Sequence, residues 1–239
     1  MGSIKFMNSK VADDLYNLAH SRNFNTFMEV LQGLQDISID TRQVEILIKI
    51  DFFSEFGNQR ELLRLMDIFY NLFKKGDVRQ ISRDKVDGTL MEPIIRKYSS
   101  DKTKAGVPAK KYTILDLSSI LCEMEEAVMA ANMDDLSDII KIQNFKDYMG
   151  YAGYVSEKEE DRPKLFVLSL YPLRRKADGK QFGYSVITKS IGSGKESRFT
   201  VFNRVFDKDP IKENDVILCT GYDRDGQYFT LTKYSHIYA

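Results

Sequence analysis

The stretch KLFVLSLYPLRRKADGKQFGYSVITKS, residues 164–190, decides the fold of the C-terminal part of this sequence. Two runs within it are rich in aromatic and β-branched residues, a composition that favours strands. The Asp178-Gly179 pair between these runs predicts a tight turn. The stretch is therefore expected to form a β-hairpin with strands at 164–176 and 181–190.

Three further strands are expected after this hairpin, at 196–203, 215–222 and 227–238. The connection between the third and fourth strands is long and irregular, and Pro210 interrupts it. Five strands in about 75 residues, with the long connection after the third, follow the order of an oligonucleotide-binding (OB) barrel. Residues 161–239 are therefore predicted to form an OB-fold domain.

A charged run at 156–163 that ends in proline marks the expected boundary before this domain. Upstream of it, apolar residues recur at helical spacing, as in Leu62, Leu65, Met66 and Phe69. The predicted fold class is α+β and multidomain, with an N-terminal all-α region followed by the five-stranded barrel. The expected parts are a helix–hairpin–helix region at 1–60, a helical linker region at 61–155 whose last helix covers 136–148, and the barrel domain at 161–239.

Residues 99–111 interrupt the helical linker region with a polar segment that contains Gly106, Pro108 and four lysines. This composition predicts a mobile basic loop. Either a solvated linker or a loop that contacts phosphate fits the pattern. The next helix is expected to open at Thr113, with Asp116 three residues later as in a capping box.

Two short segments near the start of the chain predict helix–hairpin–helix motifs. The clearer one joins a helix at about 27–34 to a helix that starts at Thr41, where Asp40 can cap and Gln43 can reach back. Such a hairpin points free N–H groups outward, where a DNA phosphate binds without sequence reading. Ordinary helix packing with ordinary caps is the alternative. The expected duplex-contacting residues are Asn8, Ser9, Lys10, Ile37, Ser38, Ile39, Asp40, Thr41 and Arg42.

Aromatic and basic residues interleave along the expected barrel strands. OB barrels bind single strands on the face of strands two and three, where rings stack on bases and cations hold the backbone. Side chains alternate along a strand, so if Tyr184 faces outward then Phe182 does too and Ser185 faces inward. The expected single-strand-binding residues are Tyr171, Arg174, Arg175, Lys176, Lys180, Phe182, Tyr184, Lys189, Lys195 and Arg198.

The net charge of zero hides an asymmetry between the two parts of the chain. Residues 161–239 carry 14 Lys and Arg against nine Asp and Glu, whereas residues 1–160 carry 21 against 26. A basic C-terminal block suits a polyanionic partner.

No catalytic centre, metal site or cofactor is expected in this chain. The Gly194-Lys195 pair lacks the earlier glycine and the following Ser or Thr of a phosphate loop. The carboxylates within 123–126 are interpreted as a solvated helix face, and Cys122 and Cys219 as buried free thiols without zinc-ligand spacing. No apolar run approaches the roughly 20 residues of a membrane span. The chain is therefore expected in the cytoplasm, without a membrane partner.

Residues 43–60, QVEILIKIDFFSEFGNQR, resemble a signature of bacterial DNA polymerase III alpha subunits, the C-family replicative polymerases. The family's version runs from a Leu-Ile-Lys step through a small-residue turn to Phe-Gly-Asn and a helix. Here Ile50-Asp51-Phe52 replaces the small turn, and Asn8 stands where a hairpin glycine is common. The helix that ends at Gly150-Tyr151 and the barrel are similar to the family's OB domain and the segment before it.

This resemblance implies a non-catalytic, DNA-binding region of a replicative polymerase. In that family a tandem helix–hairpin–helix region grips duplex DNA and the OB domain meets the single-stranded template. The magnesium-binding polymerase carboxylates lie in another part of the protein, so the implied partners are duplex DNA, single-stranded DNA and the rest of the polymerase. Met1-Gly2-Ser3 is interpreted as a cloning remnant on a piece of a longer protein. The alternative is a freestanding OB-fold interaction protein that binds RNA or a protein partner.

Overall fold

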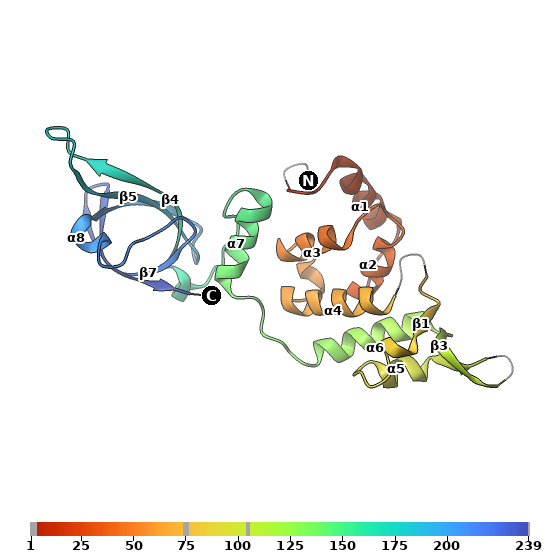
Figure 1. Cartoon of the computed structure of the whole chain (residues 1–239). Coiled ribbons are helices and arrows are strands. Elements are labelled where there is room, and N and C mark those ends of the chain that lie inside the picture. The colour runs from red at the N-terminus through yellow and green to blue at the C-terminus, as the bar shows by residue number, and fades with distance from the viewer. Residues whose placement is uncertain (1–3, 74–76, 104–105, 239) are drawn as a thin grey trace. The chain divides into compact units, whose positions relative to one another are not determined.

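The computed structural model describes residues 4–73, 77–103 and 106–238 (Figure 1). The chain divides into two compact units, residues 1–136 and 137–239. The second unit begins before the charged run at 156–163, so the expected boundary lies inside this unit.

The first unit contains most of the helices. The packed helices α2, α3, α4 and α6 contribute fully buried side chains such as Phe27, Leu47, Leu65 and Met124. This burial of apolar stripes at helical spacing is what holds the helices together. The helices of the unit are α1 (Ser9–Ser21), α2 (Phe27–Leu34), α3 (Thr41–Lys49), α4 (Gln59–Leu72), α5 (Glu92–Lys97) and α6 (Leu117–Met129), with short 3₁₀ turns η1 (Ser54–Phe56) and η2 (Arg83–Lys85).

Two of the helix starts test the predicted caps. The Asp40 side chain accepts the N–H of Gln43, and the Gln43 side chain accepts the N–H of Asp40, so the predicted capping box of α3 is confirmed. The expected start of α6 at Thr113 is wrong. Thr113 pairs in a strand, and Asp116 is the residue that caps α6, by accepting the N–H of Ser119 at 3.1 Å.

A three-stranded antiparallel sheet interrupts the helices of the first unit. It consists of β1 (Gln80–Ser82), β2 (Ser99–Lys102) and β3 (Pro108–Ile114), in the order β1-β3-β2. Both the all-α expectation and the loop expected at 99–111 are therefore wrong.

The physical reason for this hairpin is the side-chain period of β3. Lys111 and Thr113 are exposed, whereas Tyr112 between them is fully buried and donates from its hydroxyl to Asp87 Oδ1 at 2.6 Å. A period of two favours a strand that is covered on one face, even where lysines occupy part of it. Lys104 and Ala105 of the expected loop lie outside the described residues.

The second unit opens with α7 (Asp138–Met149), close to the helix expected at 136–148. Ile139 and Ile142 of α7 share an apolar cluster with Phe166, Ile191 and Val216 of the barrel. Helix α7 thus packs on the barrel instead of belonging to the helical linker region. Gly150 ends it with a φ of 80°, a left-handed conformation that glycine adopts without strain.

The remaining strands of this unit form a closed barrel in the order β4-β5-β6-β8-β7, with β4 also pairing to β7. Val167, Val186, Val201 and Leu231 are fully buried in its interior. The architecture is mixed α+β with a closed five-stranded barrel, consistent with an OB-like fold. Its elements are η3 (Glu159–Asp161), β4 (Lys164–Arg174), β5 (Gln181–Ser190), β6 (Glu196–Phe202), α8 (Asn203–Phe206), β7 (Val216–Asp225) and β8 (Tyr228–Ile237).

The described residues contain no helix that is both long and apolar enough to cross a membrane.

Candidate nucleic-acid interface

The turn between β4 and β5 carries the densest group of cations on the barrel. Arg174, Arg175, Lys176 and Lys180 are all exposed there. The turn itself is held by backbone bonds from Arg175 to Lys180 and from Gly179 to Arg175, each 2.9 Å long. The hairpin extends beyond the rest of the barrel (Figure 1), so these cations are presented to solvent as the sequence predicted.

A hollow of about 520 Å³ lies at the base of this turn, and we name it the tip pocket. The rings of Phe182 and Phe202 lie 6.2 Å apart at an angle of 41°. Such a pair of rings offers an apolar surface on which a planar base can stack. The pocket is lined by Arg175, Phe182, Phe202, Asn203 and Arg204.

Close packing of two strands shapes the tip pocket. Gly183 lies opposite Phe202 in the β5–β6 ladder, and a Cβ on Gly183 would meet the carbonyl oxygen of Val201 at 2.5 Å. Only glycine therefore allows the two backbones to lie this close at the pocket. Next to it, Asn203 donates from Nδ2 to the carbonyl of Gln181 at 3.1 Å, which ties the start of α8 to β5.

The amide oxygen of Asn203 differs from its amide nitrogen in its hydrogen bonding. Its Oδ1 is buried without a hydrogen-bond partner. A buried acceptor that lacks a donor costs free energy. The tip pocket therefore combines two rings, two guanidinium groups and an amide.

The outer face of β4, β5 and β6 continues away from the tip pocket. Tyr171, 55% exposed, lies opposite Ser185, and the exposed Arg198 lies opposite Ile187. Lys189 is on the same face, but its ammonium group donates to the carbonyl of Ala152. Tyr171 and Arg198 are accessible to a nucleic-acid strand on this face, whereas the ammonium group of Lys189 is already hydrogen-bonded.

Tyr184 does not lie on the outer face. It shares its side of β5 with the fully buried Val186, and its ring stacks on that of Phe206 with centroids 3.8 Å apart. The barrel thus uses Tyr184 for its own packing, which disfavours the expected role of this ring in base stacking. Phe182 is on the same side of β5 but near its end, where the strand leaves the core and the ring lines the tip pocket.

Lys195 lies away from the other expected single-strand-binding residues. It follows the loop at the opposite end of β5 and lines a separate hollow of about 340 Å³ with Tyr222, Arg224 and Phe229. Sequence reasoning missed these three residues, and it missed Asn203 and Arg204 at the tip pocket. Their aromatic and basic character was visible, but nothing in the sequence placed them beside the expected site.

The α2–α3 hairpin is present, and two of its polar groups lie against other parts of the first unit. The N–H of Ser38 donates to Asp14 Oδ2 over a long 3.5 Å, and the guanidinium of Arg42 lies 3.9 Å from the centroid of the Phe6 ring. Asp40 caps α3. Ile37 is half-buried, Ile39 is buried in the core, and Thr41 is exposed in the first turn of α3.

The other expected hairpin is described only from Ile4 onward. Asn8 caps α1 by accepting the N–H of Val11 at 2.9 Å, and Ser9 and Lys10 are exposed in the first turn. The described residues therefore show the capped start of the second helix of the expected motif, and the place of its first helix lies outside them. The structure brings both segments together, since Gln43 donates from Nε2 to the carbonyl of Phe6 at 2.8 Å.

The carboxylates expected on a solvated helix face have structural roles. Glu125 accepts the N–H groups of Phe27 and Met28 at 3.0 and 2.7 Å, and so caps α2 from α6. Burial raises the pKa of Glu125, although these two hydrogen bonds act against the rise. Glu123 accepts from Lys97 at 2.6 Å.

The two thiols also differ from each other. Cys122, expected to be buried, is exposed, because the helix period turns it away from the buried Leu121, whereas Cys219 is half-buried. Among the described residues no three His, Cys, Asp or Glu side chains gather as metal ligands would.

No family model matches this chain, and no curated protein or solved structure matches it.

Proposed function

We propose that the barrel binds single-stranded nucleic acid without strong sequence preference, with one base in the tip pocket. The observation that carries this proposal is the pairing of Phe182 and Phe202 with Arg175 and Arg204 around a single hollow. Every base has an aromatic face, so stacking on rings tolerates any sequence.

The cations of the β4–β5 turn supply the second part of the proposal. Arg174, Lys176 and Lys180 surround the tip pocket's own arginines with further positive charge, and Asp178 is the one acid in the turn. Its Oδ1 accepts the N–H of Lys180 at 3.0 Å, so it is engaged in the turn. Binding of phosphates to these cations releases counterions, which makes the affinity depend on salt.

The wider role proposed for the chain is a non-catalytic region of a replicative DNA polymerase, on the resemblance of residues 43–60. In that setting the barrel would meet the single-stranded template. The α2–α3 hairpin gives less support to duplex binding, because Asp36 and Asp40 outnumber its one cation, Arg42, and Asp14 lies beside the N–H of Ser38. The proposal for this chain therefore rests on the barrel.

The test is fluorescence anisotropy of the full chain with a labelled oligothymidine at several salt concentrations. Arg175→Ala combined with Arg204→Ala should reduce the slope of log affinity against log salt by about 1.4, since each lost phosphate contact contributes about 0.7 for single strands.

The charge-matched control combines Lys212→Ala with Lys233→Ala, two exposed lysines that do not line the tip pocket. This control should keep the wild-type slope. Equal slopes for the two double variants, or no binding at low salt, would reject the proposed site. In that case the barrel would instead be examined for a protein partner.

A further inference from the structure

The hollow around Lys195 is a second candidate site, and we name it the β7–β8 pocket. It has a volume of about 340 Å³ and lies at the end of β5 and β6 that is remote from the β4–β5 turn. Residues from the starts of β4 and β6 and from both strands of the β7–β8 hairpin line it. They are Arg162, Pro163, Leu165, Ser190, Ser193, Lys195, Ser197, Phe199, Cys219, Tyr222, Arg224 and Phe229.

Three aromatic rings form one wall of this pocket. The ring centroids of Phe199, Tyr222 and Phe229 lie 5.8 to 6.2 Å from one another. Phe199 is buried in the barrel core, whereas Tyr222 is 56% exposed. Tyr222 is therefore the ring that a ligand can reach, and the other two hold it in place.

Strand alternation gives the pocket a cationic lining. Tyr222 and Arg224 line it, whereas Asp223 and Asp225 between and after them do not. The guanidinium of Arg224 lies 5.5 Å from the Phe229 ring centroid, and its Nε donates to the carbonyl of Gly226 at 2.9 Å, so the cation is held beside the rings. Lys195 adds a further cation, while Arg162 is paired with Glu159 at 2.8 Å.

We propose that the β7–β8 pocket is a second nucleotide site, so that one single strand must span both pockets for full affinity. This inference rests on the proposed function of the barrel. An exposed ring beside two cations and the hydroxyls of Ser193 and Ser197 matches a base joined to a phosphodiester.

The geometry also sets the length of the strand. Ser197 lines the β7–β8 pocket and Phe202 lines the tip pocket, and both lie on β6. Five residue steps along a strand correspond to about 17 Å, and residues an odd number of steps apart point to opposite faces of the strand. At about 3.4 Å per stacked nucleotide, the distance along β6 alone corresponds to roughly five nucleotides, and the passage from one face to the other adds to it. Shorter strands occupy one pocket, and longer strands gain from the second because it is then filled intramolecularly.

The experiment measures the affinity of the full chain for oligothymidines of about three to about twelve nucleotides. Wild-type affinity should rise at least tenfold as the length passes roughly five to six nucleotides. Tyr222→Ala should abolish this step, so that the longest strands gain less than about threefold over the shortest ones. The matched control is Tyr228→Ala, a 69% exposed tyrosine on the same hairpin that does not line the pocket, and it should keep the step.

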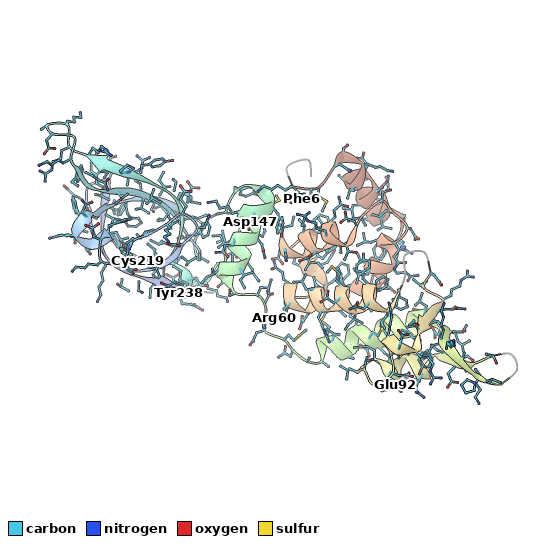
Figure 2. The ribbon with its side chains drawn as sticks, viewed as in Figure 1. Phe6, Arg60, Glu92, Asp147, Cys219 and Tyr238 are labelled. Carbon is cyan, nitrogen blue, oxygen red and sulfur yellow. The ribbon has the colours of Figure 1, made fainter. Side chains whose placement is uncertain are left out.

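Cys219 provides an independent readout because its thiol lines the same pocket (Figure 2 shows its place in the barrel). Burial raises the pKa of Cys219, so alkylation is followed at alkaline pH in a Cys122→Ser background, which removes the exposed thiol. Long strands should slow alkylation of Cys219, whereas strands of roughly three nucleotides should not.

The outcomes separate the two proposals. The second site is overturned if affinity does not rise with oligothymidine length. It is also overturned if this rise survives Tyr222→Ala while Cys219 stays reactive. Either outcome leaves the first site intact. Absence of binding at every length overturns both.

Discussion

The β4–β5 turn and the α2–α3 hairpin were both expected to contact nucleic acid, and they differ in what their polar groups already bind. In the α2–α3 hairpin, Asp14 accepts from Ser38, and the exposed Arg42 lies over the Phe6 ring. In the β4–β5 turn, Arg175 and Lys176 are exposed beside a ring-lined hollow. A motif specifies which groups are present, but the fold decides which of them remain available to a ligand.

Charge reversal should produce the largest difference between these two regions. Arg175→Glu combined with Arg204→Glu removes two charged contacts worth about 1.5 kcal/mol each, so single-strand affinity at low salt should fall at least about a hundredfold. Arg42→Glu in the other hairpin should leave single-strand affinity unchanged and alter duplex affinity by less than about twofold. Anisotropy titrations with both substrates make this comparison. A uniform loss of duplex binding in Arg42→Glu would show that this hairpin contacts DNA.

Removal of one ring sharpens the comparison within the barrel. Phe202→Ala should cost about 1–3 kcal/mol per stacked base, or roughly 5- to 150-fold in affinity, at every salt concentration. Tyr184→Ala should instead lower the melting temperature, because this ring packs on Phe206. Thermal melts and titrations of both variants separate the two roles. Loss of salt dependence in Phe202→Ala would contradict a stacking role for its ring.

A charged side chain that is paired inside the protein should affect stability and leave oligonucleotide affinity unchanged. Asp161 tests this expectation in the second unit. Burial of Asp161 opposes its ionisation, but hydrogen bonds from Lys164 and Ser156 outweigh this effect and hold its pKa below the usual value. A lowered pKa in the folded state stabilises the protein above the ordinary pKa of aspartate, and this stability is lost as the pH falls through the folded pKa.

Asp161→Asn should therefore destabilise the chain near neutral pH and reduce the loss of stability on acidification. Melting temperatures of wild type and variant, measured from neutral pH down through the acidic range, show how much stability Asp161 contributes at each pH. Parallel pH profiles would show that Asp161 makes no such contribution, and oligothymidine affinity should be equal in the two proteins wherever both are folded.

The smallest effect is expected where an internal bond is released in the α2–α3 hairpin. Asp14→Ala frees the N–H of Ser38, whose bond to Asp14 is long at 3.5 Å. Stability should fall by no more than about 1 kcal/mol, and duplex affinity should rise about two- to threefold because an acid next to the hairpin is removed. Asp13→Ala, an exposed acid on the same helix, controls for charge alone. Equal gains in both variants would show that the Ser38 amide is not involved.

Local signals in the sequence determined a large part of this structure. The aromatic and β-branched composition of 164–190 and the Asp178-Gly179 pair predicted β4, β5 and their turn, and Asp40 with Gln43 predicted the start of α3. These features depend on contacts between residues that are close in the chain, where backbone geometry and side-chain spacing decide the outcome. The exposure of Arg174–Lys180 follows for the same reason, since a hairpin turn rarely lies in a core.

Tertiary packing decided the rest. Phe202 and Arg204 come beside Phe182 because Gly183 lets β5 and β6 approach closely and Asn203 ties α8 to β5. The same closure turns Tyr184 inward, and in the first unit the burial of Tyr112 converts a lysine-rich segment into a strand. Each of these outcomes depends on burial against residues far away in the chain. The residue pattern of one β-strand predicts that one of its faces is covered. It does not predict which face this is or which residues cover it, so only the folded structure shows which rings and cations remain free to bind.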